Sequence, residues 1–349
     1  MFSVMLSNED VSAIDSSGLC GYYEKWPTYF QDALNLTISQ LDRFYPNRII
    51  YAGLGGSATP GDILKNWLSP VLNIPFIVIK DYDLPELVGK KDFVLAVSCS
   101  GDTEEVLHMV DDSIKKDCKI AVITSGGDLE KFCIKNTISC TKIKNLNVSR
   151  ASFPYLFYSA ANILKELHLL GSIENQLITS VQAVKEIQQD LIIDNPIEKN
   201  PSKELATKIF DRFPLIYVSA ENQKVAIRFQ ASLNENAKMF AHVSVIPELC
   251  HNEVEIWTKN TSRQFKPIFI RHQEESSQIS KRFKVTKQII ENAGFEVYEI
   301  WEKGKDYLSR TMRSLYLLDY ASIYTAVLRK EDPLGTPGID AIKRKMLEY

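Results

Sequence analysis

The chain has 349 residues, 45% of them hydrophobic, and its 41 Lys and Arg residues against 44 Asp and Glu residues give a net charge of −3. This length and composition exclude a disordered chain and a small disulfide-stabilised scaffold, and they indicate a globular protein of about two domains. A charge so close to balance, without a long Lys/Arg run, gives no indication of a nucleic-acid partner.

The amino terminus, MFSVMLSNED, lacks a basic segment and has only a short apolar stretch, so we expect no signal peptide. The apolar runs elsewhere are shorter than the ~18 residues that span a membrane. Six cysteines show no Cys-x-x-Cys spacing, which favours reduced thiols that pack as small hydrophobic residues over a zinc site or a disulfide framework. We therefore expect a cytoplasmic protein with no membrane partner.

The first half of the chain alternates apolar strand candidates with helical segments. Strands are predicted at Arg48 to Ala52, Pro75 to Ile79, Asp92 to Val97 and Lys119 to Thr124, and helices at Asp62 to Leu68 and Thr103 to Lys115. Consecutive apolar positions are typical of strands that are buried on both faces. The alternation predicts a parallel, doubly wound α/β sheet.

The second half repeats this pattern after a Gln/Glu-rich helical stretch, Glu174 to Leu191. Strands are predicted at Leu215 to Ser219, Lys266 to Arg271 and Glu296 to Trp301, and helices at Gln223 to Lys238, Ser277 to Ala293 and Tyr307 to Leu328. Segments 214–237 and 266–271 follow the pattern of 47–68 and 92–97, which indicates two similar lobes. We expect an amino-terminal lobe at 1–170, a helical connector at 171–205 and a carboxyl-terminal lobe at 206–349.

A glycine-rich loop, Gly53-Leu54-Gly55-Gly56-Ser57-Ala58, directly follows the first predicted strand. Glycines at such a turn let backbone N–H groups approach an anion, and the start of the next helix adds favourable partial charge. The loop also matches the dinucleotide pattern G-x-G-x-x-A. Taken alone, it fits a dinucleotide site, a sugar-phosphate site or a plain tight turn.

A second loop, Ser98-Cys99-Ser100-Gly101-Asp102-Thr103, opens a helix, and a third, Thr124 to Gly127, follows the next strand. Hydroxyl groups at a helix start suit a terminal phosphate, and a bridging pyrophosphate mainly needs close backbone approach. The plainer interpretation is an N-cap formed by Ser100 or Thr103. Since all three loops fall on one edge of the predicted sheet, together they favour a phosphate ligand.

Seven motifs in order along the chain carry a family resemblance. They are GLGGSA (53–58), AVSCSGDTEE (96–105), ITSGG (123–127), SRASFPYL (149–156), LNENAK (233–238), PELCHNEVEIW (247–257) and IDAIKRKM (339–346). In them the sequence resembles the SIS (sugar isomerase) fold and, more closely, the bifunctional phosphoglucose/phosphomannose isomerase family. The resemblance implies two SIS-type lobes and conversion of glucose 6-phosphate, and of mannose 6-phosphate, to fructose 6-phosphate through an enediol, without a cofactor.

The resemblance also implies a role for each candidate site residue. It implies a catalytic base, Glu235, with His251 and Lys343 assisting ring opening and proton movement, and Arg150 beside the reacting carbons. The residues implied to hold the phosphate are Gly55, Gly56, Ser57, Ser98, Ser100 and Thr103, and Thr336 is implied to lie near C2 of the sugar. It further implies a homodimer with shared active sites, in which the histidine comes from the partner subunit.

Some features leave alternatives open. Cys99 stands where family members commonly have an aromatic residue, Asp102 stands in place of Asn, and the segment Asp332 to Pro337 interrupts a family pattern, so mannose activity is less well supported. Glu248 and Glu253 are candidate hydrogen-bond partners of His251.

The histidine spacing indicates no metal site. The alternative function is a non-catalytic SIS sensor that binds a sugar phosphate. Taken without the resemblance, Glu235 is an ordinary helix carboxylate, and Lys343 simply complements a helix dipole.

Overall fold

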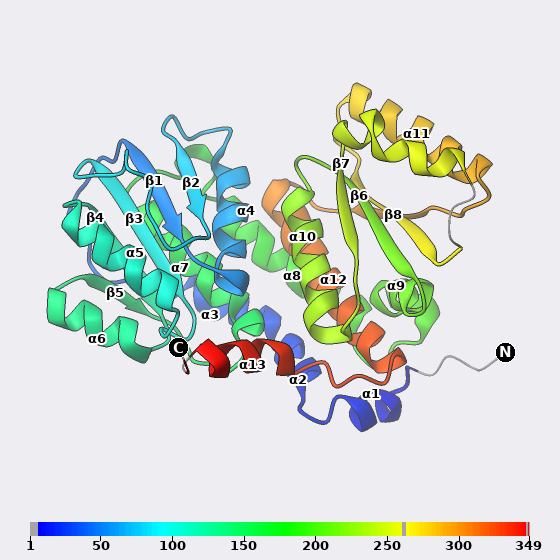
Figure 1. The fold of residues 1–349 in the computed structure, drawn as a ribbon, viewed down its shortest axis with the longest axis horizontal. Helices are drawn as coiled ribbons and strands as arrows, with labels where there is room; N and C mark the ends of the chain where they lie inside the picture. The colour runs from blue at the N-terminus through cyan, green and yellow to red at the C-terminus, as the bar shows by residue number, and fades with distance from the viewer. Residues whose placement is uncertain (1–5, 260–262, 347, 349) are drawn as a thin grey trace. The chain divides into compact units, whose positions relative to one another are not determined.

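The computed structural model describes residues 6–259, 263–346 and 348. They form two compact units: a first unit, Lys25–Val181, and a second unit that joins the residues up to Glu24 to those from Gln182 onward. Each unit has its own parallel sheet with helices on both faces (Figure 1). The predicted α/β class with two doubly wound lobes is confirmed.

The first unit contains a five-stranded parallel sheet in the order β2-β1-β3-β4-β5. Its elements are α3 (Trp26–Leu34), β1 (Arg48–Ala52), α4 (Thr59–Leu68), β2 (Phe76–Ile79), β3 (Asp92–Ser98), α5 (Glu104–Lys115), β4 (Lys119–Thr124), α6 (Gly127–Asn136), β5 (Ser139–Lys142) and α7 (Phe153–Glu166). Helices α5 and α6 cover one face, and α3, α4 and α7 cover the other. Every residue of the central strand β3 is therefore buried.

The second unit contains a four-stranded parallel sheet in the order β7-β6-β8-β9. Its elements are α1 (Asn8–Ile14), α2 (Leu19–Glu24), α9 (Pro201–Ile209), β6 (Phe213–Ser219), α10 (Gln223–Ala237), β7 (His242–Ile246), β8 (Phe265–His272), α11 (Ser277–Asn292), β9 (Tyr298–Glu302), α12 (Tyr307–Leu328) and α13 (Pro337–Met346). Helix α8 (Gln176–Leu191) crosses from the first unit into the second. Both sheets begin with a central strand and then add neighbours in the same order, as the predicted repeat requires.

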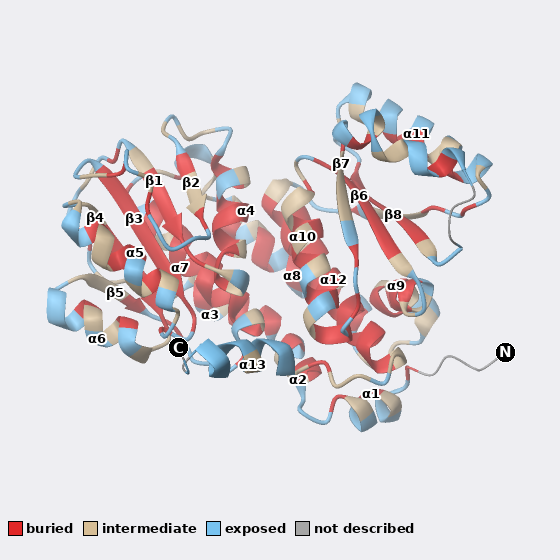
Figure 2. Ribbon diagram, viewed as in Figure 1, coloured by how far each residue is buried: buried red, intermediate tan, exposed pale blue. Residues whose placement is uncertain are grey.

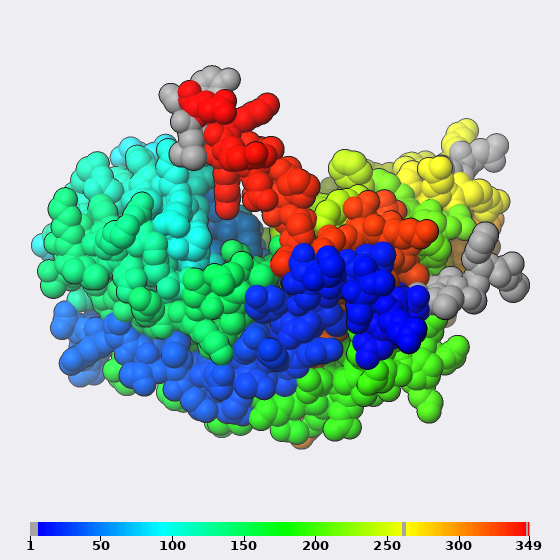
Figure 3. Space-filling model, turned by 90° about the horizontal axis from the view of Figure 1, so that it is seen from below, coloured from blue at the N-terminus to red at the C-terminus, as the bar shows by residue number. Residues whose placement is uncertain are grey.

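The amino-terminal residues lie in the second unit, which corrects the expected lobe at 1–170. Helices α1 and α2 contact α12, and the hydroxyl of Tyr316 donates to the carbonyl oxygen of Tyr23 at 2.8 Å. Ser16 and Ser17 both hydrogen-bond Asp332 at 2.9 Å. Figure 3 shows this blue segment packed against the orange residues near the carboxyl terminus. The observed boundary at 181/182 also lies inside the expected connector.

Burial explains which elements the sequence pattern revealed. Helix α12 is buried along almost its whole length and packs on α9 and α10, whereas α13 has no buried residue (Figure 2). The predicted strands β1, β3, β4, β6 and β8 are confirmed. Strands β5 and β7 were not predicted, because each is a short, partly polar edge strand. Within the described part of the chain, no helix is both long and apolar enough to cross a membrane.

Candidate functional site

The loop after β1 is shaped by close backbone approach. A Cβ atom on Gly53 would lie 3.0 Å from the Ser57 carbonyl oxygen and 3.1 Å from that of Val97, so a larger residue would displace the backbone. Gly55 has φ +52°, a conformation that favours glycine. The Ser57 hydroxyl accepts a hydrogen bond from the Cys99 backbone N–H at 3.2 Å. The first loop is therefore joined to the loop after β3.

The loop after β3 brings its hydroxyl groups together at the start of α5. The Ser98 and Thr103 hydroxyl oxygens lie 2.8 Å apart in a hydrogen bond, and Ser98 also accepts from the Gly101 N–H at 3.1 Å. Thr103 is the N-cap residue of α5 but makes no side-chain capping hydrogen bond, and Ser100 accepts from the Asp102 N–H instead. Thr103 therefore occupies the expected N-cap position, but its hydroxyl group bonds Ser98 instead of capping the helix.

The third loop, after β4, packs directly on the second. The Ser125 hydroxyl donates to the Cys99 carbonyl oxygen at 2.6 Å, and the Leu129 N–H donates to the Gly101 carbonyl oxygen at 2.9 Å. Gly101 has φ +80°, and a Cβ there would lie 1.8 Å from the Gly126 carbonyl oxygen. The three loops thus meet at the carboxyl edge of the first sheet, where β1 and β3 are neighbours and the chain changes direction across the sheet. Ligands bind at this position in open α/β sheets.

Arg150 lies against the same edge. It stands in a short 3-10 helix, Ser149–Ser152, and its Cα atom would be 3.8 Å from a Cβ placed on Gly56. The thiol of Cys99 interacts with Ser149 and Ser152 of this helix. One edge of the first unit therefore carries Arg150 together with all six residues predicted to hold a phosphate.

Glu235 and Thr336 lie in the second unit and line one cavity of about 480 Å³. Glu235 stands in the last turn of α10, and Thr336 directly precedes α13. Lys238 holds these two segments together, because its ammonium group donates to the carbonyl oxygens of Glu235, Asp332 and Gly335 at 2.8 to 2.9 Å. The sequence reasoning did not assign Lys238 a role, and only its position at a helix end offered a signal.

Helix α10 is fixed beneath this cavity by a buried ion pair with α12. The Arg228 guanidinium donates to Asp319 at 2.6 and 3.1 Å, and the Ser232 hydroxyl donates to the same carboxylate at 2.8 Å. Asn236, the neighbour of Glu235, donates to the Ser322 hydroxyl at 2.7 Å. These bonds to α12 fix the orientation of α10, the helix that carries Glu235.

His251 lies at the other end of strand β7 from Glu235. Helix α10 runs back along the sheet, so its last turn lies near the start of β7, while His251 follows the end of β7 in a 3-10 helix, Glu248–His251. The five residues of β7 span roughly 16 Å at about 3.3 Å per residue. The two side chains are therefore not brought together within one unit.

The expected partners of His251 are engaged elsewhere. Glu253 bonds His242 at 2.9 Å and also contacts Ser244, and Glu248 accepts from Asn252 at 3.3 Å. The pairing of His251 with Glu253 is therefore corrected: Glu253 pairs with His242, which lies beside it on β7. His251 itself is exposed, and Lys343 is exposed on α13.

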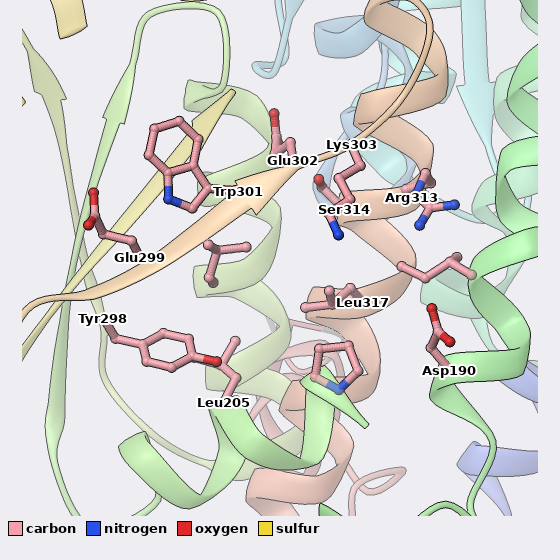
Figure 4. Close-up of a pocket in the computed structure, with 13 residues that line it drawn as sticks. Asp190, Leu205, Tyr298, Glu299, Trp301, Glu302, Lys303, Arg313, Ser314 and Leu317 are labelled. Carbon is pink, nitrogen blue, oxygen red and sulfur yellow. The ribbon is translucent and has the colours of Figure 1, made fainter. Parts of the chain in front are cut away.

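A second cavity of this unit, of about 210 Å³, lies between β9 and the helices α8, α9 and α12 (Figure 4). Tyr298, Trp301 and Glu302 line it, and no predicted site residue is among the described residues around it. Across residues 6–259, 263–346 and 348, no group of three or more His, Cys, Asp or Glu side chains is placed to hold a metal ion. The predicted residues thus belong to the loop edge of the first unit and to the Glu235 cavity and His251 loop of the second.

Comparison with known proteins concerns the family and the fold. The sequence model of the bacterial phospho-glucose isomerase C-terminal SIS domain matches residues 198–346. A hypothetical protein from Thermus thermophilus superposes with a TM-score of 0.74 at 16% identity, over 97% of this chain and 94% of its own. That likeness concerns the fold alone.

Relatives with higher identity identify the family. The D-glucosamine-6-phosphate 4-epimerase of Sulfolobus acidocaldarius is 31% identical over 71% of this chain and 76% of its own length. The bifunctional phosphoglucose/phosphomannose isomerase of Caldicellulosiruptor bescii is 32% identical over 86% of this chain and 90% of its own length. Isomerases of the same name from further organisms match an equal share of the chain. The chain belongs to the bifunctional phosphoglucose/phosphomannose isomerase family.

Proposed function

We propose that this phosphosugar isomerase interconverts glucose 6-phosphate, and mannose 6-phosphate, with fructose 6-phosphate through an enediol. The observation that carries the proposal is the meeting of three hydroxyl-rich loops at the carboxyl edge of the first sheet, beside Arg150 and the start of α5. Backbone N–H groups at a helix start and nearby hydroxyl groups favour a terminal phosphate.

Each step of the isomerisation then has a candidate residue. Glu235 is the base that moves a proton between C1 and C2, and general-base catalysis of this kind contributes about 10²–10⁴-fold to the rate. His251 and Lys343 assist opening of the sugar ring, and Arg150 supplies positive charge near the developing enediolate. Thr336 shares the Glu235 cavity, which supports its position near C2.

The decisive test is a coupled assay of the purified protein on both aldose phosphates, with fructose 6-phosphate as the detected product. We expect turnover without added nicotinamide and after treatment with a chelator. Loss of turnover on chelation, or turnover only with a nicotinamide, contradicts the proposal. Binding of the sugar phosphates without turnover indicates the sensor alternative.

The 31% identical relative named as a 4-epimerase makes epimerisation at C4 of D-glucosamine 6-phosphate the second candidate reaction. The same purified protein is incubated with that compound, and its C4 epimer is sought by NMR. We expect no epimer to form. Epimer formation in the absence of fructose 6-phosphate from either aldose would replace the isomerase proposal.

The proposed active unit is a homodimer in which His251 enters the partner's site. Support comes from β7, which separates Glu235 from His251 in one subunit. The test mixes Glu235→Gln and His251→Ala proteins under conditions of subunit exchange. A heterodimer then has one site with both changes and one with neither. Each heterodimer should therefore have about half the activity of a wild-type dimer. No return, with exchange confirmed by mass spectrometry, places both residues in one subunit's site.

A further inference from the structure

A groove of about 750 Å³ lies at the amino end of the first sheet, at the opposite end of its strands from the three loops. Its walls come from the starts of β4 and β5, the ends of α5 and α6, and segment 39–42. Three of the six cysteines line it as free thiols: Cys118, Cys133 and Cys140.

Two of these thiols contact one another. Cys133 in α6 is 1% exposed and belongs to an apolar cluster, against which the partly buried Cys140 of β5 packs, and the two thiols share a side-chain hydrogen bond. The turn between them explains the contact: Thr137, directly after α6, has φ +56°, and the Ile138 N–H donates to the Cys133 carbonyl oxygen at 2.9 Å. The chain therefore reverses at once and places β5 beside the end of α6.

The third thiol is arranged differently. The Cys118 sulfur lies 3.4 Å from the Gly89 carbonyl oxygen, to which it donates, and burial raises the pKa of the Cys118 thiol to about 11. The described residues do not bring three such ligands together around a metal position. The groove thus holds one contacting thiol pair and one separate thiol.

We propose that Cys133 and Cys140 are an oxidation-sensitive pair, which a hydroperoxide converts into an intrachain disulfide. The Cys140 thiolate attacks a peroxide oxygen, the O–O bond breaks, and a sulfenic acid and hydroxide form. Cys133 then attacks the Cys140 sulfur, the S–O bond breaks, and its thiol proton leaves with the hydroxyl group as water. The hydroxide takes up the proton that the Cys140 thiol released on becoming a thiolate. In total the two thiols lose two electrons and two protons, and hydrogen peroxide is reduced to two molecules of water.

The surroundings of the two thiols give this order of attack. Cys140 is the more exposed sulfur, and the hydrogen bond from the Cys133 thiol lowers the pKa of Cys140. The same contact, together with burial, raises the pKa of Cys133. A thiolate reacts with peroxide and a buried thiol does not, so Cys133 is suited to resolve the sulfenic acid rather than to form it.

The experiment treats the reduced full-length protein with a small excess of hydrogen peroxide, then alkylates the remaining thiols and digests with trypsin. Cleavage after Lys131, Lys135 and Lys142 places Cys133 and Cys140 in adjacent peptides, 132–135 and 136–142. We expect these two peptides to appear joined by a disulfide, and the free thiol count to fall by two per chain. Reduction with dithiothreitol should restore both peptides.

Cysteine variants distinguish formation of this disulfide from nonspecific oxidation of the protein's thiols. Cys118→Ser, in the same groove, should leave the joined peptides unchanged, and Cys140→Ser should abolish them. Cys133→Ser should instead let sulfenic acid accumulate on Cys140, where dimedone traps it. A wild-type protein whose Cys140 stays reduced, or is joined to Cys118 or to another chain, overturns the proposal. The wild-type result decides even where a variant folds poorly, and none of it depends on isomerase activity.

Discussion

The carboxyl edges of the two sheets have the same topology but different contents. In the first unit, the loops after β1 and β3 consist of glycines and hydroxyl residues, and backbone groups lie close together. At the equivalent place in the second unit, after β6 and β8, Glu221 is bonded by Arg310 at 2.9 Å and lies 3.3 Å from His272. One edge carries glycines and hydroxyl groups, and the other carries charged side chains that pair with one another.

Part of the charged edge is buried. His272 and Glu302 are paired in register at the ends of β8 and β9, and both are at least 95% buried. The hydrogen bond that His272 donates to the Glu221 carboxylate raises the pKa of His272, while burial raises the pKa of Glu302 to about 7. The comparison shows that two units with the same sheet topology can carry different side chains at the carboxyl edges of their sheets. It predicts that changes in the second unit alter turnover or stability, and changes in the loops of the first alter substrate affinity.

The largest effect is expected from Glu235→Gln in the second unit. The change keeps the shape of the side chain and removes its basicity, so turnover should fall about 10²–10⁴-fold while KM changes little. Steady-state kinetics with fructose 6-phosphate as substrate or product measure both constants. Asn234→Ala, one residue earlier in the same cavity wall, is the control for nonspecific damage. An unchanged kcat in Glu235→Gln would show that the base has been misassigned.

Arg228→Met tests the buried ion pair that fixes α10. It leaves the Asp319 carboxylate buried without its charged partner, which should lower the free energy of unfolding by about 3–5 kcal/mol. Urea denaturation measures the loss. Arg212→Met removes an ion pair whose side chains are about half exposed, and should change stability by about 0–1 kcal/mol. Equal losses in the two variants would mean that burial does not set the strength of the pair.

Glu302 should make the second unit less stable as the pH rises. Its carboxyl has a pKa of about 7 when folded and an ordinary value of 4.5 when unfolded, so its proton stabilises the fold at low pH. This contribution is present below pH 4.5 and is lost as the pH approaches 7, by on the order of 3 kcal/mol.

The test compares Glu302→Gln with the wild type in urea at about pH 5 and at about pH 8, on either side of the folded pKa. We expect the variant to gain stability relative to the wild type at the higher pH. Glu299→Gln is the control, because Lys287 and Arg271 hold the pKa of Glu299 below its ordinary value. That variant should keep the same stability relative to the wild type at both pH values, because a carboxyl with a lowered pKa is already ionised above pH 4.5 in the folded and the unfolded chain. A gain in stability by both variants would show that burial of Glu302 is not the cause of the pH dependence.

The smallest effect is expected from Ser100→Ala and Thr103→Ala in the first unit. Each hydrogen bond lost to a charged phosphate is worth about 1.5–3 kcal/mol, so the substrate KM should rise by roughly 10- to 150-fold with little change in kcat. Ser276→Ala removes the N-cap of α11, at the equivalent place after β8, where the hydroxyl accepts from the Ile279 N–H. It should lower stability and leave KM unchanged. A similar KM in all three variants would place the phosphate elsewhere.

Much of the fold could be predicted because its central strands are continuous apolar runs, as at β3 and β6. The edge strands β5 and β7 could not, because Ser139, Thr141 and Ser244 interrupt their apolar pattern. The place of residues 6–24 was also hidden, since their contacts with α12 join parts of the chain that are far apart in sequence and leave no local pattern.

The candidate site was predictable to different degrees. The three loops of the first unit follow from strand order alone, because parallel strands bring their carboxyl ends to one edge. Glu235 and Thr336 are far apart in the sequence, and only the family resemblance connected them before the structure placed both on one cavity. The expected His251–Glu253 contact was wrong because spacing cannot show that His242 lies opposite Glu253.

Lys238 shows why a common route to higher thermostability would fail at this position. The residue has φ +49°, where glycine or asparagine is ordinarily preferred and replacement gains roughly 1 kcal/mol. A designer guided by backbone preference alone would choose glycine. The Lys238 ammonium group, however, also holds the Asp332–Gly335 segment against α10. Glycine would remove the strain of the positive φ. It would also remove the hydrogen bonds that hold the segment before Thr336, so the wall of the Glu235 cavity would become less rigid.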